Sequence, residues 1–568
     1  MIAVLTYWCY LFLITSIVGV SFQKVVKLKK SHPVIPFFLG GFAISLMGSL
    51  WAIFYGLGFY FEVFLLLISI VLIIWKQKTY FFFLGSLKAK INALPSYLKL
   101  LLGIITVFAI AQCASAPYII DNESYYIQTI TWLDTYGFVK GLANFHFFLA
   151  QNSGWHILQS ALNLDVIASF FNDINGFYLV IGNIYALDKL AHYLKQKETH
   201  LLIIGLFPIF NVFLFQFISS PSPDLPIYLL SFVIFGEFLS HYTPHKGASY
   251  STLFILGVFA VFIKVTAVFL LIFPVILYIK NKKTLQQDLS KLSLLSGIAF
   301  ILFVIKNSII SGYPLYPIAS FRLTHVDWTL PLALQEYLVE TTKHYAFFLT
   351  PKEYENSTLI QRIIHWLRLP KLHGLFNVGM CVALVIFPLW IRKVRFKKPL
   401  YILYSVSILQ LLFLWLTSPQ YRFFLGFFML LSLTIIATRI KNERIIKIGL
   451  AVATIAIAVP LFIPFNLNAL TKNEFQLQLS VFSPEYLIQP HPQTKYTQAT
   501  YTTHQEGNMR IQTPTNIDFF WATGDCELPC IQLQHLNDFK AYFRSVPQLR
   551  TEHLKDGFYS YTFDKKNE

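Results

Sequence analysis

Charged side chains are scarce in this chain. Asp, Glu, Lys and Arg together make up 13% of its 568 residues, whereas hydrophobic residues make up 55%. A soluble protein of this length needs far more polar surface, because charged residues are the ones that normally cover it. The composition therefore excludes an ordinary soluble protein. It predicts an all-α membrane protein whose helices cross the bilayer many times.

The sequence also lacks a basic domain, although its net charge is +17. The Lys and Arg residues lie in short loops between apolar runs, as the positive-inside rule expects of a membrane protein. Because no nucleic-acid reader motif accompanies them, we do not expect nucleic acid as a partner. The surroundings expected for this chain are membrane lipids.

Cysteines are few as well, with five in the chain. Cys9, Cys113 and Cys381 lie in apolar runs, where cysteine usually serves as a small packing residue. Cys526 and Cys530 lie in the polar tail, in the segment GDCELPC. If the tail is outside the cell membrane, in an oxidising compartment, their spacing favours a disulfide. A metal site is less favoured, because no second cysteine pair accompanies them.

Apolar runs long enough to cross a bilayer recur along the chain. When the runs alternate across a membrane, every strongly basic loop falls on one side, which we assign to the cytoplasm. Both termini then lie on the outer side of the membrane. Two of the runs, over 249–281, are short enough to be broken helices. We expect about 14 spans, near residues 1–23, 34–56, 59–76, 97–116, 174–194, 200–219, 223–241, 249–264, 266–281, 293–312, 374–392, 399–417, 420–438 and 446–465.

The arrangement of spans and polar stretches predicts three regions. A small C-terminal periplasmic domain follows the last span, and the alternation in FQLQLSVF (475–482) predicts a β-strand in it. The regions are an N-terminal transmembrane extension (1–95), a transmembrane core (96–465) with outer loops over 117–173 and 313–373, and the C-terminal domain (466–568).

The first outer loop begins with two acidic residues, Asp121 and Glu123, directly after an apolar run. Asp121 is a suitable helix N-cap. The spacing of apolar residues after it predicts amphipathic helices lying on the outer membrane interface. Carboxylates so close together can also bind a divalent metal or change each other's pKa. Both interpretations of Asp121, a helix cap and a catalytic group, are open at this point.

The rest of this loop is rich in aromatic, amide and imidazole side chains. Such a mixture suits a sugar, which is bound by ring faces and by groups that both donate and accept hydrogen bonds. A structural role fits His146 equally well. The candidate substrate-binding residues here are Asn144, His146, Asn152 and His156.

Three basic residues, Lys264, Lys306 and Arg422, fall at the outer ends of spans, where the positive-inside rule makes them rare. Ionisable groups at such positions are costly and indicate function, although snorkelling to headgroups is the alternative. Asp224 joins them at the outer start of its span. Carboxylates facing cations at one membrane surface suit an anionic, membrane-borne substrate such as a lipid phosphate.

An acidic D-x-E pair in the first large outer loop, directly after a span, resembles the GT-C superfamily of integral-membrane glycosyltransferases. The resemblance implies that residues 96–465 form a GT-C-like core. It also implies that the pair supplies an essential carboxylate and that the sugar donor is a polyprenyl phosphate.

The chain is also similar to a group of bacterial multi-spanning, GT-C-like proteins whose substrates are not established. A basic residue stands at the position of Lys306 in that group. The matching stretches are TWLDTYGFVKGLANFHFFLAQNSGWH, ISSPSPDLP, KNSIISGYPLYP, TSPQYRF, and CELPC followed by DGF.

The function expected from these features is transfer of a hexosyl or pentosyl group, at the periplasmic face, to a lipid-linked or cell-envelope glycan. Asp121 would be the base and Glu123 its partner or a ligand of a divalent metal, while Lys264, Lys306 and Arg422 would bind phosphate. No cofactor is certain. The alternatives are a transporter or flippase of lipid-linked or polar solutes, and a polysaccharide polymerase or ligase. Transport is less favoured because most segments at midspan are apolar.

Overall fold

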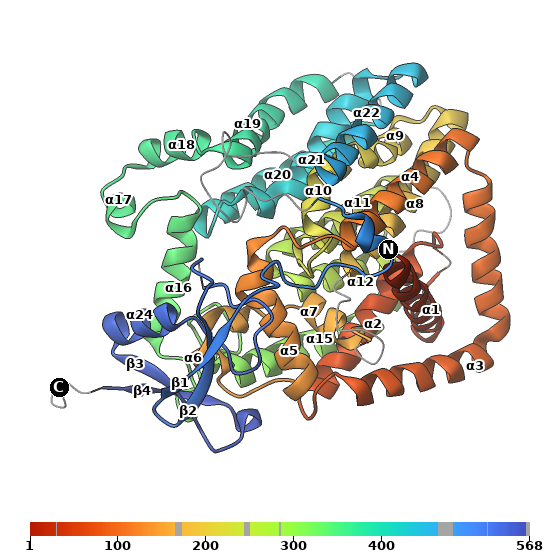
Figure 1. Cartoon of the computed structure of the whole chain (residues 1–568). Helices are drawn as coiled ribbons and strands as arrows, with labels where there is room; N and C mark the ends of the chain where they lie inside the picture. Colours follow the sequence, from red (N-terminus) through yellow and green to blue (C-terminus); the bar gives the residue numbers. More distant parts are fainter. Residues whose placement is uncertain are drawn as a thin grey trace.

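The chain folds mainly into helices, and a small region at its C-terminus contains β-strands (Figure 1). The structure is a computed structural model, and it describes residues 1–29, 31–164, 173–242, 250–282, 286–392, 394, 396–463, 481–519 and 521–563.

Within these residues, eleven helical segments are long and apolar enough to cross a membrane. Helices are the expected solution, because a bilayer leaves no water to satisfy an unpaired backbone group. The segments are α1 (Ile2–Val25), α2 (Ile35–Ala52), α3 (Phe59–Asn92), α4 (Ser96–Cys113), Thr199–Phe217, α11 (Asp224–Tyr242), Gln286–Ser311, α19 (Lys371–Ile391), α20 (Lys398–Leu416), α21 (Tyr421–Arg439) and α22 (Glu443–Phe462).

Two of these segments are composite. Thr199–Phe217 consists of α9 (Thr199–Gly205), η3 (Phe207–Phe210), α10 (Asn211–Leu214) and η4 (Phe215–Phe217). Gln286–Ser311 consists of η6 (Gln286–Asp288) and α15 (Leu289–Ser311).

Three further predicted spans are helical but are shorter or more polar. α8 (Ile174–Gln196) is long enough but carries several charged residues towards its end. α12 (Tyr250–Ile263) is short, and the next helical stretch, η5 (Val265–Leu271) and α13 (Ile272–Lys280), is short as well. The expectation of a mainly helical protein with many helices long and apolar enough to cross a membrane is therefore confirmed, whereas the count of 14 spans stays a prediction.

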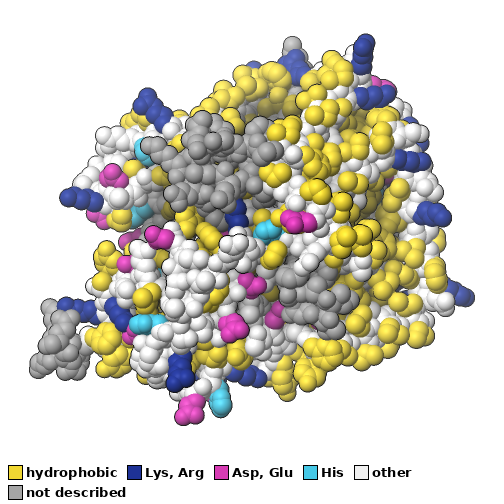
Figure 2. Space-filling model, in the orientation of Figure 1, with side chains coloured by type: hydrophobic (Ala, Val, Ile, Leu, Met, Phe, Trp, Pro, Cys, Tyr) yellow, Lys and Arg dark blue, Asp and Glu magenta, His cyan; other side chains and the backbone are white. Residues whose placement is uncertain are grey.

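Helix α3 is longer than the predicted span over 59–76. It continues to Asn92, with non-helical backbone angles at Lys76 (φ −117°, ψ 24°). Figure 1 shows its two limbs along the lower and right edges of the molecule. The residues after Lys76 form a helix where a basic loop was predicted. Figure 2 shows that hydrophobic side chains dominate the right-hand part of the visible face.

Helices α1 and α2 pack with their backbones in close contact. A Cβ atom on Gly19 would lie 1.7 Å from the carbonyl oxygen of Pro36, and one on Gly40 would lie 1.9 Å from that of Thr15. Small residues allow membrane helices to approach in this way and to gain packing energy.

The C-terminal region contains two antiparallel strand pairs. β1 (Tyr501–Glu506) pairs with β2 (Met509–Pro514), and β3 (Ser545–Leu549) pairs with β4 (Phe558–Thr562). The turn η7 (Pro484–Leu487), helix α24 (Leu533–Phe543), turn η8 (Leu554–Asp556) and a Cys526–Cys530 disulfide complete it. Most of the predicted strand over 475–482 lies outside the described residues.

The first outer loop contains η1 (Asn122–Tyr126), α5 (Ile127–Tyr136), α6 (Leu142–Phe145), η2 (Phe147–Gln151) and α7 (Gly154–Ala161). All eight residues of α7 are buried, so the prediction that it lies on the membrane surface is wrong.

The C-terminal region packs against this loop, and the Phe558 ring stacks on that of Phe145 with centroids 5.0 Å apart. The Phe558 N–H also donates to the carbonyl oxygen of Lys140 at 2.9 Å. An amphipathic pattern shows only that one helix face is covered, and here much of that cover is protein rather than lipid.

The second outer loop contains α16 (Leu332–Tyr345), α17 (Pro351–Glu355) and α18 (Leu359–Leu367). In Figure 1 these helices form an arm at the left of the molecule.

We expect Gly40→Leu to destabilise the protein by at least about 1–3 kcal/mol, because the new side chain would force α1 and α2 apart. Gly449→Leu is the matched control, since among the described residues nothing outside the neighbouring backbone of α22 lies within 4 Å of a Cβ at that position. Thermal unfolding in detergent measures both. Equal melting temperatures for the two variants would contradict the close packing of α1 on α2.

Candidate functional site

Asp121 lies between α4 and η1, a π-helical turn of a kind often found at functional sites. Within the described turn, its side chain makes no capping hydrogen bond. Its Oδ2 atom instead accepts a hydrogen bond from Nη1 of Arg422 at 2.6 Å and one from the hydroxyl of Tyr126 at 3.4 Å. Of the two interpretations of Asp121, the helix cap does not fit.

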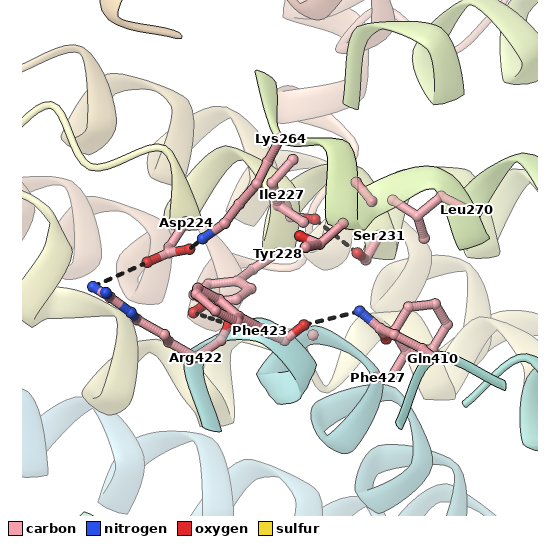
Figure 3. A pocket seen from close by; sticks show the side chains of 13 residues that line it. Asp224, Ile227, Tyr228, Ser231, Lys264, Leu270, Gln410, Arg422, Phe423 and Phe427 are labelled. Atoms are coloured by element: carbon pink, nitrogen blue, oxygen red, sulfur yellow. Dashed lines mark hydrogen bonds and ion pairs between the residues drawn. The ribbon is translucent and has the colours of Figure 1, made fainter. Parts of the chain in front are cut away.

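Asp224 and Lys264 lie beside Arg422 of this pair (Figure 3). Nζ of Lys264 contacts Oδ1 of Asp224, and Nη1 of Arg422 lies 4.0 Å from Oδ2 of Asp224. Asp224 begins α11, Lys264 lies between α12 and η5, and Arg422 lies in the first turn of α21. Three helix ends and the first outer loop therefore meet in one four-charge cluster, namely Asp121, Asp224, Lys264 and Arg422.

The cluster is balanced in charge and partly open. The side chain of Asp224 is 3% exposed and that of Asp121 is 15% exposed. The cavity bordered by Asp224, Lys264 and Arg422 has a volume of about 10 Å³, close to the least that one water needs. The ion pairs thus fill the space between them, and Asp121 is the carboxylate more accessible to a ligand.

Neighbouring groups fix the orientation of Arg422. Its Nε donates to Oε1 of Gln420 at 3.1 Å, and its carbonyl oxygen accepts from the hydroxyl of Tyr228 at 2.8 Å. The Lys264 ammonium lies 4.1 Å from the centroid of the Phe423 ring, which is a cation–π contact. The cations are therefore held in place by contacts besides their carboxylates.

Lys306 lies in a second polar group next to the four-charge cluster. It is buried in α15, and its Nζ donates to the carbonyl oxygen of Asn152. Among the described residues, Oδ1 of Asn152 and Nε2 of His156 have no hydrogen-bond partner. The His156 ring lies 4.9 Å from the ring of Tyr126, which contacts Asp121. Burial, with the nearby Lys306 charge, lowers the pKa of His156 to about 3, so this histidine is neutral.

Glu123 does not join the partners of Asp121. Its carboxylate accepts hydrogen bonds from the Thr494 hydroxyl at 2.6 Å, the Lys495 N–H at 2.8 Å and the Asn122 amide at 3.2 Å. Side chains two positions apart on a helical turn point in different directions, which accounts for the separation. Among the described residues, no group of three or more His, Cys, Asp or Glu side chains is placed to hold a metal ion.

Asn144 and His146 also contact other parts of the protein. The Asn144 amide donates to the carbonyl oxygen of Trp328 at 2.8 Å, and its Oδ1 accepts from the Ser560 hydroxyl at 2.7 Å. The His146 ring stacks on that of His535 with centroids 4.3 Å apart. Burial lowers the pKa of His146 to about 3. The structural role that was open for His146 fits these contacts.

Two residues of the site, Tyr126 and Gln420, were not predicted from the sequence. Tyr126 falls among the residues after Asp121 whose spacing predicts a helix, but its hydroxyl also donates to Asp121. No role was predicted for Gln420, although it lies in the same TSPQYRF segment as Arg422 and orients it. An amide two positions before an unusual arginine was the available signal for it.

The Glu123 carboxyl makes a pH prediction possible, because burial raises its pKa to about 7 from the value near 4.5 of an exposed glutamate. The folded state therefore holds this proton more tightly than the unfolded state does. The contribution of the protonated Glu123 carboxyl to the free energy of unfolding is therefore complete below about pH 4.5 and is lost as pH rises through 7. We expect the wild-type protein to melt at a higher temperature at pH 5.5 than at pH 8, and Glu123→Gln to reduce that difference.

Thermal unfolding at the two pH values measures the effect. The control is Glu485→Gln, which changes an exposed carboxylate in the C-terminal region that also supplies the partners of Glu123. This variant should keep the wild-type pH dependence. If Glu123→Gln and wild type showed the same pH dependence of the melting temperature, Glu123 would not be the group whose raised pKa causes it.

The comparisons with known proteins identify a family only. No curated protein and no solved structure matches the chain. A family model described as "Domain of unknown function (DUF8201)" matches residues 1–429. That range contains all members of the four-charge cluster and ends before the C-terminal strands. The chain therefore belongs to the DUF8201 family.

Proposed function

We propose that this protein is a GT-C-like glycosyltransferase of the bacterial inner membrane. It moves a sugar from a polyprenyl-phosphate donor to a lipid-linked or cell-envelope glycan at the periplasmic face. The observation that carries the proposal is the four-charge cluster, in which the partly exposed Asp121 carboxylate lies 2.6 Å from Arg422, next to Asp224 and Lys264. A base and two cations in contact suit transfer from a phosphate leaving group.

The proposed reaction uses these residues as follows. The acceptor hydroxyl gives its proton to Asp121 while its oxygen forms a bond to the anomeric carbon of the sugar. The bond from that carbon to the phosphate oxygen breaks, and the polyprenyl phosphate leaves with the electron pair. Arg422 and Lys264 stabilise the charge on the departing phosphate. Because a phosphate can bind an arginine in bidentate fashion, donor binding would release Asp121 from Arg422 to act as the base.

A row of aromatic rings supports approach of the substrate from the lipid. Tyr345 and Phe348, which are 48% and 41% exposed, have ring centroids 5.4 Å apart. Phe348 contacts His373 at 4.7 Å, and His373 contacts Tyr421 at 4.9 Å. Tyr421 directly precedes Arg422. This aromatic row connects an exposed surface to the four-charge cluster and suits an apolar polyprenyl chain whose phosphate reaches Arg422.

The polar group at Lys306 supports a carbohydrate ligand. The atoms Asn152 Oδ1 and His156 Nε2 are buried and lack partners among the described residues. Buried polar atoms usually have a hydrogen-bond partner, so a sugar hydroxyl or a water is expected there. The Lys306 ammonium beside them could contact the donor phosphate or a hydroxyl.

The distribution of charge along α11 disfavours the transport hypothesis. Asp224 lies at the start of this helix, whereas Glu237 lies near its end and pairs with Lys189 at 3.2 Å. The residues between them are nearly all apolar. A transporter site is expected near the middle of the membrane, often at broken helices. Here the charges of α11 lie towards its two ends.

We expect Asp121→Asn to reduce sugar transfer by about 10²–10⁴-fold, since the base would be lost. Purified protein in bilayers is incubated with polyprenyl-phosphate sugars and a lipid extract containing acceptors, and release of polyprenyl phosphate is measured. Envelope glycans are profiled in cells that carry the same variant.

Asp327→Asn is the matched control, because this carboxylate is exposed and pairs with Arg550 away from the four-charge cluster. It should retain full activity. Wild-type release and an unchanged glycan profile in the Asp121→Asn variant would refute the proposed role of Asp121.

A further inference from the structure

Helix α18 exposes an unusual stripe of large apolar side chains. Leu359, Ile360, Ile363 and Ile364 are 63%, 69%, 38% and 44% exposed. At 100° per residue these four side chains share one side of the helix. An apolar stripe this continuous rarely faces water in a soluble surface. The apolar stripe on α18 is therefore expected to be covered by lipid or by protein.

The rest of the helix is divided between protein and polar surroundings. Trp366 is buried, its indole N–H donates to the carbonyl oxygen of Pro419 at 2.8 Å, and its ring lies 5.4 Å from that of Trp415. Arg362 donates to the carbonyl oxygens of Tyr354 and Ser357 at 2.8 Å each. The anchored side thus faces the protein; it borders the apolar stripe at Leu359, whereas Ile360 and Ile364 point away from it.

A polar strip completes the circumference of α18. Gln361 and His365 are exposed on the side away from the isoleucines. Arg368 and Lys371, which follow the helix, are exposed as well. An apolar side, a polar side and nearby cations are the properties of a helix that lies in the plane of a membrane surface. The cations suit anionic headgroups.

The position of α18 relative to the spans agrees with this. The span α19 begins a short turn after α18 ends. Pro419, which holds Trp366, lies in the turn between the spans α20 and α21, next to Arg422. Leu416 at the end of α20 is 77% exposed. The helix is therefore fixed at the level where three apolar spans end.

We propose that α18 lies in the interfacial layer of the bilayer, on the side where the four-charge cluster lies, with lipid acyl chains covering Leu359, Ile360, Ile363 and Ile364. A second copy of the chain or a soluble protein could cover the same stripe. Lipid is the occupant favoured here, because α18 is anchored at the ends of apolar spans, where Leu416 is exposed as well, and the flanking residues are basic. The proposal is independent of the reaction that the protein catalyses.

Site-directed fluorescence in nanodiscs that each hold one copy tests this proposal. The full chain with Cys9→Ser and Cys381→Ser receives single cysteines at Ile360, Ile364, Gln361 or His365, each labelled with bimane. Lipids with brominated acyl chains quench a bimane that lies among the chains. We expect quenching at Ile360 and Ile364 to be at least twofold stronger than at Gln361 and His365.

Equal quenching at the four positions, or stronger quenching at Gln361 and His365, would overturn the proposal. Disulfide crosslinks between copies through the cysteine at Ile360, in nanodiscs that hold two copies, together with weak quenching there, would assign the stripe to a second copy. Bimane labels at Leu359 and Ile363 repeat the quenching measurement on the same stripe. The test therefore still gives a result if one of the other variants fails to fold. Size-exclusion profiles identify folded variants.

Discussion

The ion pair between Asp121 and Arg422 is the contact on which the site depends, because it joins segments that are distant in the sequence. It connects the first outer loop to α21, and through Asp224 and Lys264 it also connects α11 to the turn after α12. Removing charges from water costs free energy, and a buried charge that loses its partner destabilises the protein. Their mutual neutralisation therefore fixes how four parts of the chain meet. It also leaves in place the two cations and the carboxylate that the proposed transfer needs.

The two carboxylates of the D-x-E pair, Asp121 and Glu123, contact different parts of the protein. Asp121 faces Arg422, whereas Glu123 is buried against Thr494 and Lys495 of the C-terminal region. Glu123, Asn144 and His146 all connect the first outer loop to that region, so the region acts as a cover for the loop. This arrangement explains why a loop rich in polar residues is almost entirely buried. It also places the candidate base at the border between protein cover and exposed surface.

The sequence predicted the large elements of the fold well, because apolar length alone identifies most spans. It also placed Asp121, Asp224, Lys264 and Arg422 at one membrane surface, because charges at span ends are unusual, and the structure brings these four residues together. The burial of α7 against α2 and α12 was not predictable, and neither were the partners of Glu123 in the C-terminal region, which lie 371 and 372 residues away in the sequence, because both depend on long-range contacts. The interfacial helices were expected in the first outer loop, whereas the exposed apolar stripe lies on α18. Helical periodicity gives the face of a helix but does not identify what covers it.

The family match also bears on the proposed reaction. It covers residues 1–429, which hold the four-charge cluster and the group at Lys306, and it ends before the C-terminal strands. The buried partners of Glu123 thus come from outside the matched range, whereas every partner described for Arg422 lies inside it. A reaction shared by the family would have to use groups of the matched range. The four-charge cluster satisfies that condition without any residue of the C-terminal region, which makes Asp121 a stronger candidate than Glu123 for the family's common chemistry.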